Sequence, residues 1–290
     1  MSQNKPTTRE HYIPQCYLNR FSADEKDFLQ SDEKYIYQYD VISCTQILKP
    51  VPIKSICYEK DLYEFKDDSG NILHRNLIEK SFRVFEGEFA KTFRSIQSKA
   101  LCEDNYQIRS FLSLEEKAFL VFFISTVIVR NPDILRVAQK DVMEFLGDQI
   151  TEASARNLIL QTCLPIYNTF DVKEKTILDY VMESLNNMSF QIGIADKYVF
   201  WTSDRPVILH GKNFDNCNEV IMPISPHLVL YMKPYKNTKK GFYNRLIKLD
   251  KKFVEYINSS IVTHCKRWVF SNTLLTSGQI KWISKERNHI

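Results

Sequence analysis

Two short polar sequences near opposite ends of the chain hold side chains that could do chemistry. The first, His11-Tyr12-Ile13-Pro14-Gln15, contains the only histidine before residue 74. Its imidazole suits a general base or a metal ligand near neutral pH. The second, Thr202-Ser203-Asp204-Arg205-Pro206, places a carboxylate directly after an expected strand, which is a rigid position for a metal ligand or acid–base group. Each also has a structural alternative: His11 would hydrogen-bond a backbone carbonyl and seat the N-terminal segment, and Asp204 would bind a turn backbone.

Three further charged residues could join these two. Glu79 and Glu86 are seven positions apart, so they lie on nearly the same edge of an expected helix. With Arg83 between them they form either a surface ion-pair ladder or a pair of carboxylates that faces His11 or Asp204. Arg130 ends a very apolar helix, where it either satisfies the last carbonyls or holds an anionic group such as phosphate.

A basic segment runs from residue 233 to residue 252, with eight Lys or Arg residues and one Asp. Aromatic residues stand among these charges, a mixture that suits contact with phosphates and stacking on bases. A solvated loop followed by a charged helix face explains the same composition. The candidate nucleic-acid contacts in this segment are Lys239, Lys240, Tyr243, Arg245 and Lys248.

Composition indicates a folded chain with a sizeable core. Its 290 residues are 44% hydrophobic and 13% aromatic, with a net charge of +4, and we expect one compact domain over 1–290. The seven glycines are few for this length, and neither G-x-G-x-x-G nor G-x-x-x-x-G-K-[ST] occurs. Ordinary ATPases and dinucleotide-binding enzymes are therefore disfavoured.

Cysteine usage and hydropathy favour a cytoplasmic location. Seven cysteines at irregular spacing, with no C-x-x-C pair, indicate free thiols and argue against a structural zinc site. The first ten residues are polar and lack an export segment. The longest apolar run, near 119–129, is shorter than the roughly 18 residues typical of a membrane span, so no membrane partner is expected.

Hydrophobic periodicity predicts an α+β fold. Residues 1–70 form an N-terminal β-hairpin region, 71–190 a central helical bundle, and 191–290 a mainly antiparallel sheet with flanking helices. Ser113 and Glu116 form a capping box that opens the apolar helix. The expected helices are 76–98, 113–130, 133–146, 150–164, 172–187, 250–261 and a short one after 277, and the later strands are 198–201, 207–209, 220–222, 228–231 and 268–270.

The two polar sequences also carry a family resemblance. His11-Tyr-Ile-Pro-x-x-Tyr-Leu-x-x-Phe resembles the opening of a large bacterial family known as domain of unknown function four-two-three-eight. The resemblance covers nearly the whole chain. It departs from the family at Arg205, where a small polar residue is common. It implies a stand-alone bacterial protein, and some members of the family are associated with defence against bacteriophage. The other agreeing residues are Tyr58-Glu59-Lys60-Asp61-Leu62-Tyr63, Glu79, Glu86, Arg130-Asn131-Pro132, Thr202-Ser203-Asp204-x-Pro206, Pro223-x-Ser225-Pro226, Asn258 and Val269-Phe270-Ser271.

One hypothesis is that the chain is an anti-phage effector with metal-dependent nuclease or other phosphoester hydrolase activity. Asp204 with Glu79 or Glu86 would hold Mg²⁺ or Mn²⁺, which polarises the phosphoryl group and activates water. His11 would serve as base or ligand, and Arg130 would hold phosphate.

The alternative is a non-enzymatic sensor or binding module that recognises a phage protein or nucleic acid. The two polar sequences would then be fold-defining turns that tie the N-terminal arm to the sheet, and metal chelation would have no effect.

Overall fold

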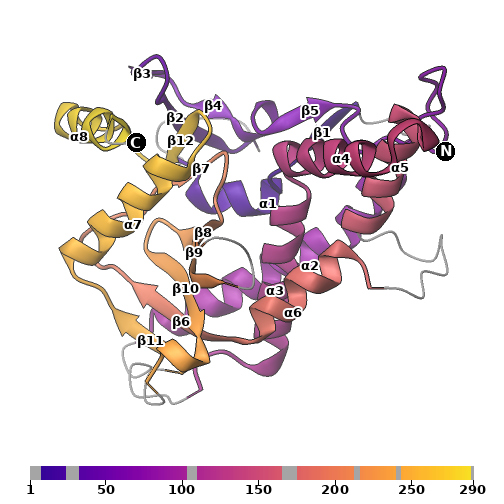
Figure 1. Cartoon of the computed structure of the whole chain (residues 1–290). Helices are drawn as coiled ribbons and strands as arrows, with labels where there is room; N and C mark the ends of the chain where they lie inside the picture. Colours follow the sequence, from indigo (N-terminus) through magenta and orange to yellow (C-terminus); the bar gives the residue numbers. More distant parts are fainter. Residues whose placement is uncertain are drawn as a thin grey trace, which may run out of the picture. The chain divides into compact units, whose positions relative to one another are not determined.

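The computed structural model describes residues 8–23, 33–102, 110–164, 175–211, 216–239 and 243–288. The chain forms two compact units, and Figure 1 labels their helices and strands. The first unit comprises Met1–Pro14, Cys57–Phe89 and Leu120–Asn186, and the second comprises Gln15–Ile56, Ala90–Phe119 and Asn187–Ile290. Helices and sheets are both present, which confirms the predicted α+β class, while the single domain over 1–290 stays a prediction.

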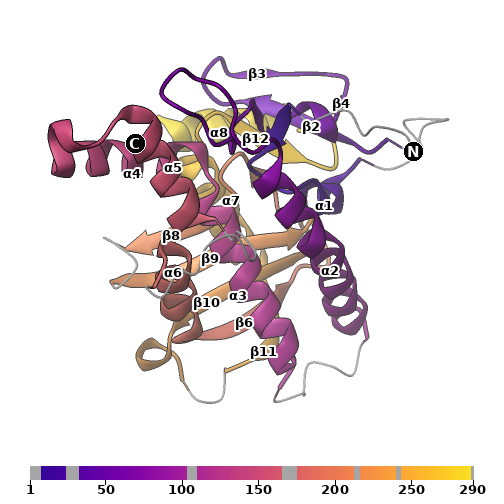
Figure 2. The same cartoon turned by 90° about the vertical axis from the view of Figure 1, so that its right-hand side faces the viewer.

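The first unit is mostly helical. Strand β1 (Arg9–His11) pairs antiparallel with β5 (Tyr58–Lys60). The helices are α2 (Leu77–Ala100) and α3 (Leu114–Val129), which also supply residues to the second unit, together with α4 (Pro132–Leu146), α5 (Glu152–Cys163) and α6 (Ile177–Asn186). Helices α4 and α5 lie side by side in Figures 1 and 2.

An aromatic stripe positions α2 against α3 within the first unit. The predicted stripe is buried at Ile78, Phe82 and Phe89, as helical spacing requires. The Phe89 ring meets the Phe123 ring edge-on at a centroid distance of 4.6 Å. Within the described residues no single helix is long and apolar enough to cross a membrane, although α3 and the segment 132–149 pass that test together as a pair bent by 65°.

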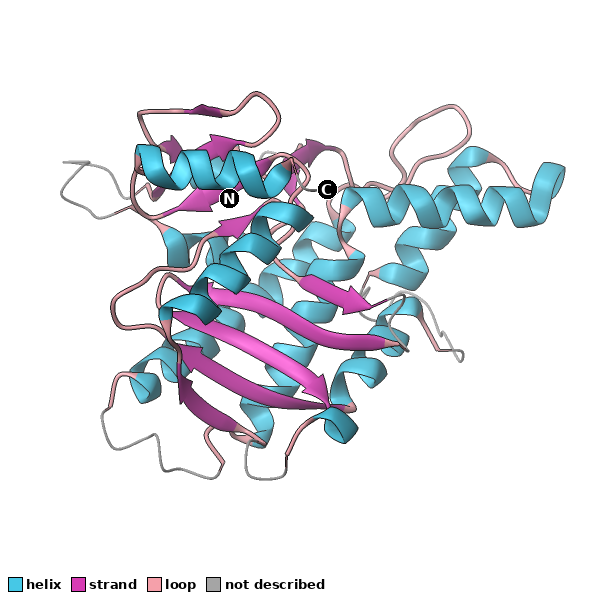
Figure 3. Cartoon of the chain, turned by 60° about the vertical axis from the view of Figure 1, so that its left-hand side comes forward, coloured by secondary structure: helices cyan, strands magenta, loops and turns pink. Residues whose placement is uncertain are grey.

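The second unit contains a five-stranded sheet in the order β11-β6-β10-β9-β8, drawn in magenta in Figure 3. Its pairs are antiparallel except for the parallel pair of β11 with β6. The strands are β6 (Met188–Ile194), β8 (Ile208–Gly211), β9 (Cys217–Ser225), β10 (Leu228–Pro234) and β11 (Arg245–Lys248).

A smaller sheet in the same unit joins residues from both ends of the chain. Its order is β3-β2-β12-β7, with β4 also paired to β2. The bounds are β2 (Tyr35–Asp40), β3 (Thr45–Gln46), β4 (Val51–Pro52), β7 (Thr202–Ser203) and β12 (Trp268–Ser271), and the associated helices are α1 (Gln15–Leu18), α7 (Lys251–His264) and α8 (Ser277–Arg287). Val254, Ile257 and Ile261 of α7 pack with Ile208 and Ile221 of the larger sheet in one core.

Two expectations about strands were wrong. The run 198–201 is not a strand; it is held instead by Phe200 N–H donating to the Pro226 carbonyl and Trp201 N–H donating to Asn258 Oδ1, and only the next two residues form β7. Strand β6 lies partly inside the region predicted to be helical. The sequence did not predict this buried strand, because Ser189, Gln191 and Gly193 have low β-propensity. The helix predicted over 172–187 begins at Ile177, and 165–174 lies outside the described residues.

Substitution of Gly193 should destabilise the larger sheet. A Cβ at this position would lie 2.8 Å from Cγ1 of Val229 and closer still to Leu249. We expect Gly193→Ala to lower the free energy of unfolding by about 1–3 kcal/mol in urea denaturation. The matched control is Gly87→Ala in α2, where nothing lies within 4 Å of the added Cβ and helix propensity predicts a gain of roughly 0.5–1 kcal/mol. Equal effects at both sites would contradict this packing.

Candidate functional site

Arg130 is the centre of a buried polar cluster in the first unit. Its side chain is 1% exposed, and its Nη2 donates to the His11 carbonyl. Its Nε donates to the Tyr63 hydroxyl at 3.4 Å, and its guanidinium lies 3.9 Å from the centroid of the Phe82 ring. The carboxylate of Glu86 lies 3.8 Å from Nη1. Arg130 therefore joins β1, α2 and the segment after β5 instead of presenting a free cation to a ligand.

Buried carboxylates lie near this arginine, and their removal from water disfavours their charged forms. Burial raises the pKa of Glu79 and of Glu86, and the charge of Arg130 opposes both shifts. Burial also raises the pKa of Glu10 to about 7, although the Tyr63 N–H donates to this carboxylate at 2.6 Å. Glu79 and Glu86 therefore lie close enough to Arg130 for its charge to oppose the effect of burial, and their role as metal ligands stays a prediction.

His11 meets this cluster through its backbone. Its imidazole is 9% exposed and packs against the Tyr58 ring at 5.7 Å, opposite it in the β1–β5 pair. Because the carbonyl of His11 accepts from Arg130, the structural role considered for this residue has a direct physical basis.

Asp204 belongs to the second unit, where it binds backbone. Its Oδ1 accepts from the Lys266 N–H at 2.8 Å, and its Oδ2 accepts from Arg267 N–H at 2.8 Å and Trp268 N–H at 3.0 Å. Burial raises the pKa of Asp204, and these three donors oppose that shift. Both oxygens accept backbone hydrogen bonds, which gives the structural role considered for Asp204 a direct physical basis, while its role as a ligand to Mg²⁺ or Mn²⁺ stays a prediction. Within the described ranges, no three His, Cys, Asp or Glu side chains form a metal-binding group.

The chain just after the first polar sequence contacts the second polar sequence within the second unit, through the side chain of Tyr17. The Tyr17 hydroxyl donates to the Pro223 carbonyl at 2.8 Å and lies 2.7 Å from the Thr202 hydroxyl. All three groups are buried. This contact ties the N-terminal arm to β7 and β9, as the binding-module hypothesis expects of fold-defining turns.

Part of the positive charge of the basic segment (233–252) is paired with a neighbouring carboxylate. Lys248 pairs with Asp196, and the Tyr243 hydroxyl donates to the Tyr235 carbonyl at 3.2 Å. The rings of Tyr235 and Tyr243 pack edge-on at 5.0 Å. Lys239 is exposed, Arg245 is half-buried at the start of β11, and Lys240 lies outside the described residues.

A cluster of histidine, glutamate and tyrosine side chains was missed in the sequence. His210 on β8 stands opposite Glu219 on β9, and its Nδ1 lies 2.6 Å from Glu219 Oε1. The hydroxyls of Tyr231 and Tyr256 donate to the same carboxylate. Burial alone would raise the pKa of Glu219, but hydrogen bonds from His210, Tyr231 and Tyr256 outweigh it and lower the pKa to about 2. This carboxylate is therefore a fixed negative charge beneath His210.

His264, at the end of α7, completes this histidine cluster. Its ring centroid lies 5.0 Å from that of His210. Its Nδ1 donates to the Ser260 carbonyl at 2.9 Å, because a carbonyl can only accept. Burial and the nearby charges of His210 and Arg205 lower the pKa of His264, against the hydrogen bond to Ser260.

Both imidazoles thus have a fixed orientation. Glu219 accepts from Nδ1 of His210, and the Ser260 backbone accepts from Nδ1 of His264, so the Nε2 atom of each ring remains for chemistry. The His210 side chain is 26% exposed, enough to reach a ligand. Two oriented imidazoles with a perturbed carboxylate are the arrangement that general acid–base catalysis requires.

One signal in the sequence pointed to this cluster. Tyr256, Ser260 and His264 are spaced i, i+4 and i+8, so they lie along one face of the expected helix. The partners His210 and Glu219 are adjacent only through the β8–β9 register, and a periodicity analysis does not supply that register.

Replacement of Asp204 tests its structural role. Asp204→Asn turns an NH₂ group toward backbone N–H donors, so we expect the free energy of unfolding to fall by about 1–3 kcal/mol in urea, with or without Mg²⁺. Asp196→Asn is the control, because it removes an exposed ion pair that contributes at most about 1 kcal/mol. Loss of stability that appears only in the presence of Mg²⁺ would contradict the backbone role.

Glu10 predicts a pH dependence of stability. Between pH 4.5 and about 7 the unfolded chain releases a proton that the folded chain keeps, so this residue's contribution is full below pH 4.5 and is lost as pH rises through 7. Glu10→Gln cannot ionise, so its stability relative to wild type should rise from pH 5 to pH 8 in chemical denaturation. Glu59→Gln, opposite in register, is the control. A difference independent of pH would refute this.

Comparison with known proteins places the chain in a family. Neither the curated proteins nor the solved structures contain a match to it. The sequence profile described as "Protein of unknown function (DUF4238)" matches residues 9–274, which include both polar sequences and the histidine cluster. The chain therefore belongs to the DUF4238 family.

Proposed function

We propose that this protein is a bacterial anti-phage effector that cleaves RNA by metal-independent acid–base chemistry at His210 and His264. The observation that carries the proposal is the pair of imidazoles 5.0 Å apart, each with its Nδ1 hydrogen committed to an acceptor. Two imidazoles of opposite protonation state supply the base and the acid of a phosphoryl transfer.

The surroundings assign different roles to the two rings. The lowered pKa of His264 favours its neutral form near pH 7, which suits a general base. Glu219 holds the His210 ring through Nδ1, which leaves its Nε2 as the proposed general acid. Arg205 and Lys233 add positive charge beside the cluster, and Lys233 lies 3.8 Å from Glu219.

The proposed substrate is RNA, because its ribose 2′-hydroxyl can serve as the nucleophile once a general base takes its proton. Nε2 of His264 takes the proton of a ribose 2′-hydroxyl, and the 2′-oxygen attacks phosphorus. The bond from phosphorus to the 5′-oxygen breaks, and His210 donates its proton to that oxygen. The products are a 2′,3′-cyclic phosphate and a 5′-hydroxyl, and DNA, without the 2′-hydroxyl, is not a substrate.

This proposal replaces the site first expected from sequence while keeping the class of reaction. Glu86 lies beside Arg130, and the oxygens of Asp204 accept from backbone, so no step is assigned to Mg²⁺ or Mn²⁺. The role in phage defence rests on the family resemblance.

A second candidate function is a non-enzymatic module that binds a phage protein or nucleic acid. The contacts of Tyr17 with Thr202 and Pro223 favour it, because they tie the N-terminal arm to the second polar sequence and to β9. Under this alternative the histidine cluster would stabilise the sheet edge without turnover.

The test is cleavage of end-labelled RNA and DNA of one sequence by the purified full chain in EDTA. We expect RNA cleavage to cyclic phosphate ends, a bell-shaped pH profile, and no DNA cleavage. His264→Gln and His210→Gln should each lower the rate by about 10²-fold or more. His74→Gln, at an exposed position in the first unit, is the control.

Two outcomes would overturn this proposal. Cleavage that requires Mg²⁺ or Mn²⁺ would restore the metal-dependent hypothesis, and binding of nucleic acid without cleavage under any condition would support the binding module. Thermal unfolding of each variant separates loss of activity from loss of fold. In phage plating assays, His264→Gln should abolish protection if the cluster is the effector site.

A further inference from the structure

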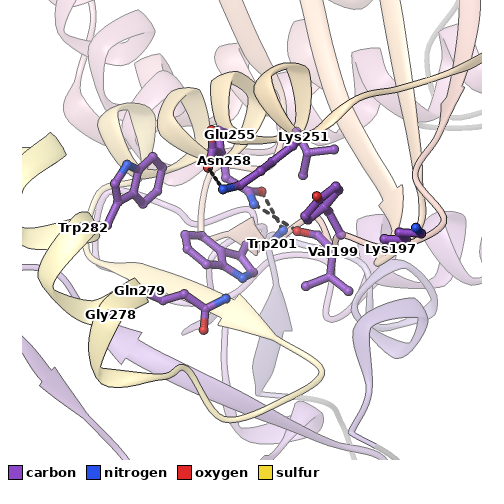
Figure 4. Close-up of a pocket in the computed structure, with 11 residues that line it drawn as sticks. Lys197, Val199, Trp201, Lys251, Glu255, Asn258, Gly278, Gln279 and Trp282 are labelled. Atoms are coloured by element: carbon purple, nitrogen blue, oxygen red, sulfur yellow. Dashed lines mark hydrogen bonds and ion pairs between the residues drawn. The ribbon is translucent and has the colours of Figure 1, made fainter.

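A cavity of about 420 Å³ lies in the second unit beside α7 and the start of α8 (Figure 4). Its volume falls within the range of small-molecule sites. Trp201 and Trp282 form an aromatic corner in its wall, with ring centroids 5.7 Å apart and an interplanar angle of 62°. Two of the three tryptophans in the chain therefore line one cavity.

Hydrogen-bond donors dominate the polar part of this cavity. Trp201 is 3% exposed, and its indole Nε1 has no acceptor. Gln279 uses its side-chain oxygen in the α8 capping box, where it accepts from the Thr276 N–H at 2.8 Å, so its NH₂ group is left as a donor. In Figure 4 the nitrogen edge of Trp201 and the amide nitrogen of Gln279 turn toward each other. Two adjacent donors call for an acceptor that the protein does not supply.

The cavity also carries positive charge. Lys197 and Lys251 line it, and its one acidic lining residue, Glu255, pairs with Lys251 at 3.5 Å. Gly278 brings the first turn of the eleven-residue helix α8 to the wall, and the helix dipole there adds to the attraction for an anion.

We propose that this cavity binds a planar aromatic ring that carries an anionic group, with the size and chemistry of a nucleoside monophosphate. The indoles of Trp201 and Trp282 contact the ring, and the donors and lysines hold the anion.

This site is separate from the histidine cluster. Lys251, Glu255 and Asn258 follow the spacing i, i+4, i+7 on α7, whereas Tyr256, Ser260 and His264 form a different stripe of the same helix. The binding proposal therefore does not depend on RNA cleavage.

The test is a titration of tryptophan fluorescence in the full chain carrying Trp268→Phe, which removes the tryptophan outside the cavity. AMP is the probe, with adenosine and inorganic phosphate as the two partial ligands. We expect saturable quenching by AMP and at least tenfold weaker binding of either partial ligand. Lys251→Ala should weaken AMP binding about tenfold, and the neighbouring exposed Lys252→Ala, which does not line the cavity, should not.

Three results would overturn the proposal. They are no saturable response to millimolar AMP, equal affinity for adenosine and AMP, or the same affinity in Lys251→Ala and Lys252→Ala. Gly278→Glu provides a second variant that adds negative charge at the wall with space for the side chain, and it should abolish AMP binding while the thermal midpoint stays near wild type. Unchanged binding by Gly278→Glu would contradict the assigned anion position.

Discussion

The second unit depends on one carboxylate bound to consecutive backbone amides. Asp204 follows β7 and accepts from the N–H groups of residues 266–268, directly before and at the start of β12. This fixes the β7–β12 pair, because the bonds of a two-residue strand could not hold its register alone. It also places Arg267 where its guanidinium pairs with Asp40 of β2 at 2.8 Å. Charge-assisted bonds of this kind are stronger than neutral ones, so a single buried side chain organises three segments distant in sequence.

Helix α7 supplies residues to both candidate sites, the histidine cluster and the tryptophan cavity. Asn258 donates to the Val199 carbonyl and accepts from the Trp201 N–H, so it holds the irregular segment before β7 without a strand ladder. One side of the helix then completes the tryptophan cavity, while another carries His264 to the edge strand β8. Because core residues of α7 pack on the larger sheet, this helix gives both sites a rigid support.

Those elements that depend on local sequence patterns, chiefly helices and their caps, were predicted from the sequence. Helical periodicity located α2 to α5 and α7, and the Ser113–Glu116 capping box is present with both hydrogen bonds. Residues 198–201 look like a strand because they are β-branched or aromatic, but their backbone groups bond to the Asn258 side chain and the Pro226 carbonyl instead of a neighbouring strand. Prediction of the candidate site would have required knowing which residues distant in sequence lie opposite one another. Tyr17 and Thr202 are 185 positions apart, and nothing local in either sequence specifies their hydrogen bond.

Burial separates residues that hold the fold from residues that can act on a substrate. Arg130 is 1% exposed and Asp204 is 4% exposed, and the polar groups of both are bound within the protein. Charged groups this deeply buried depend on their hydrogen bonds, because an unpaired buried charge costs several kcal/mol, roughly 3–5 when one partner is removed. His210 is oriented just as firmly through Glu219, yet its side chain is 26% exposed. A catalytic side chain needs both a fixed orientation and access to substrate, so the edge of β8 is a better candidate site than Arg130 or Asp204.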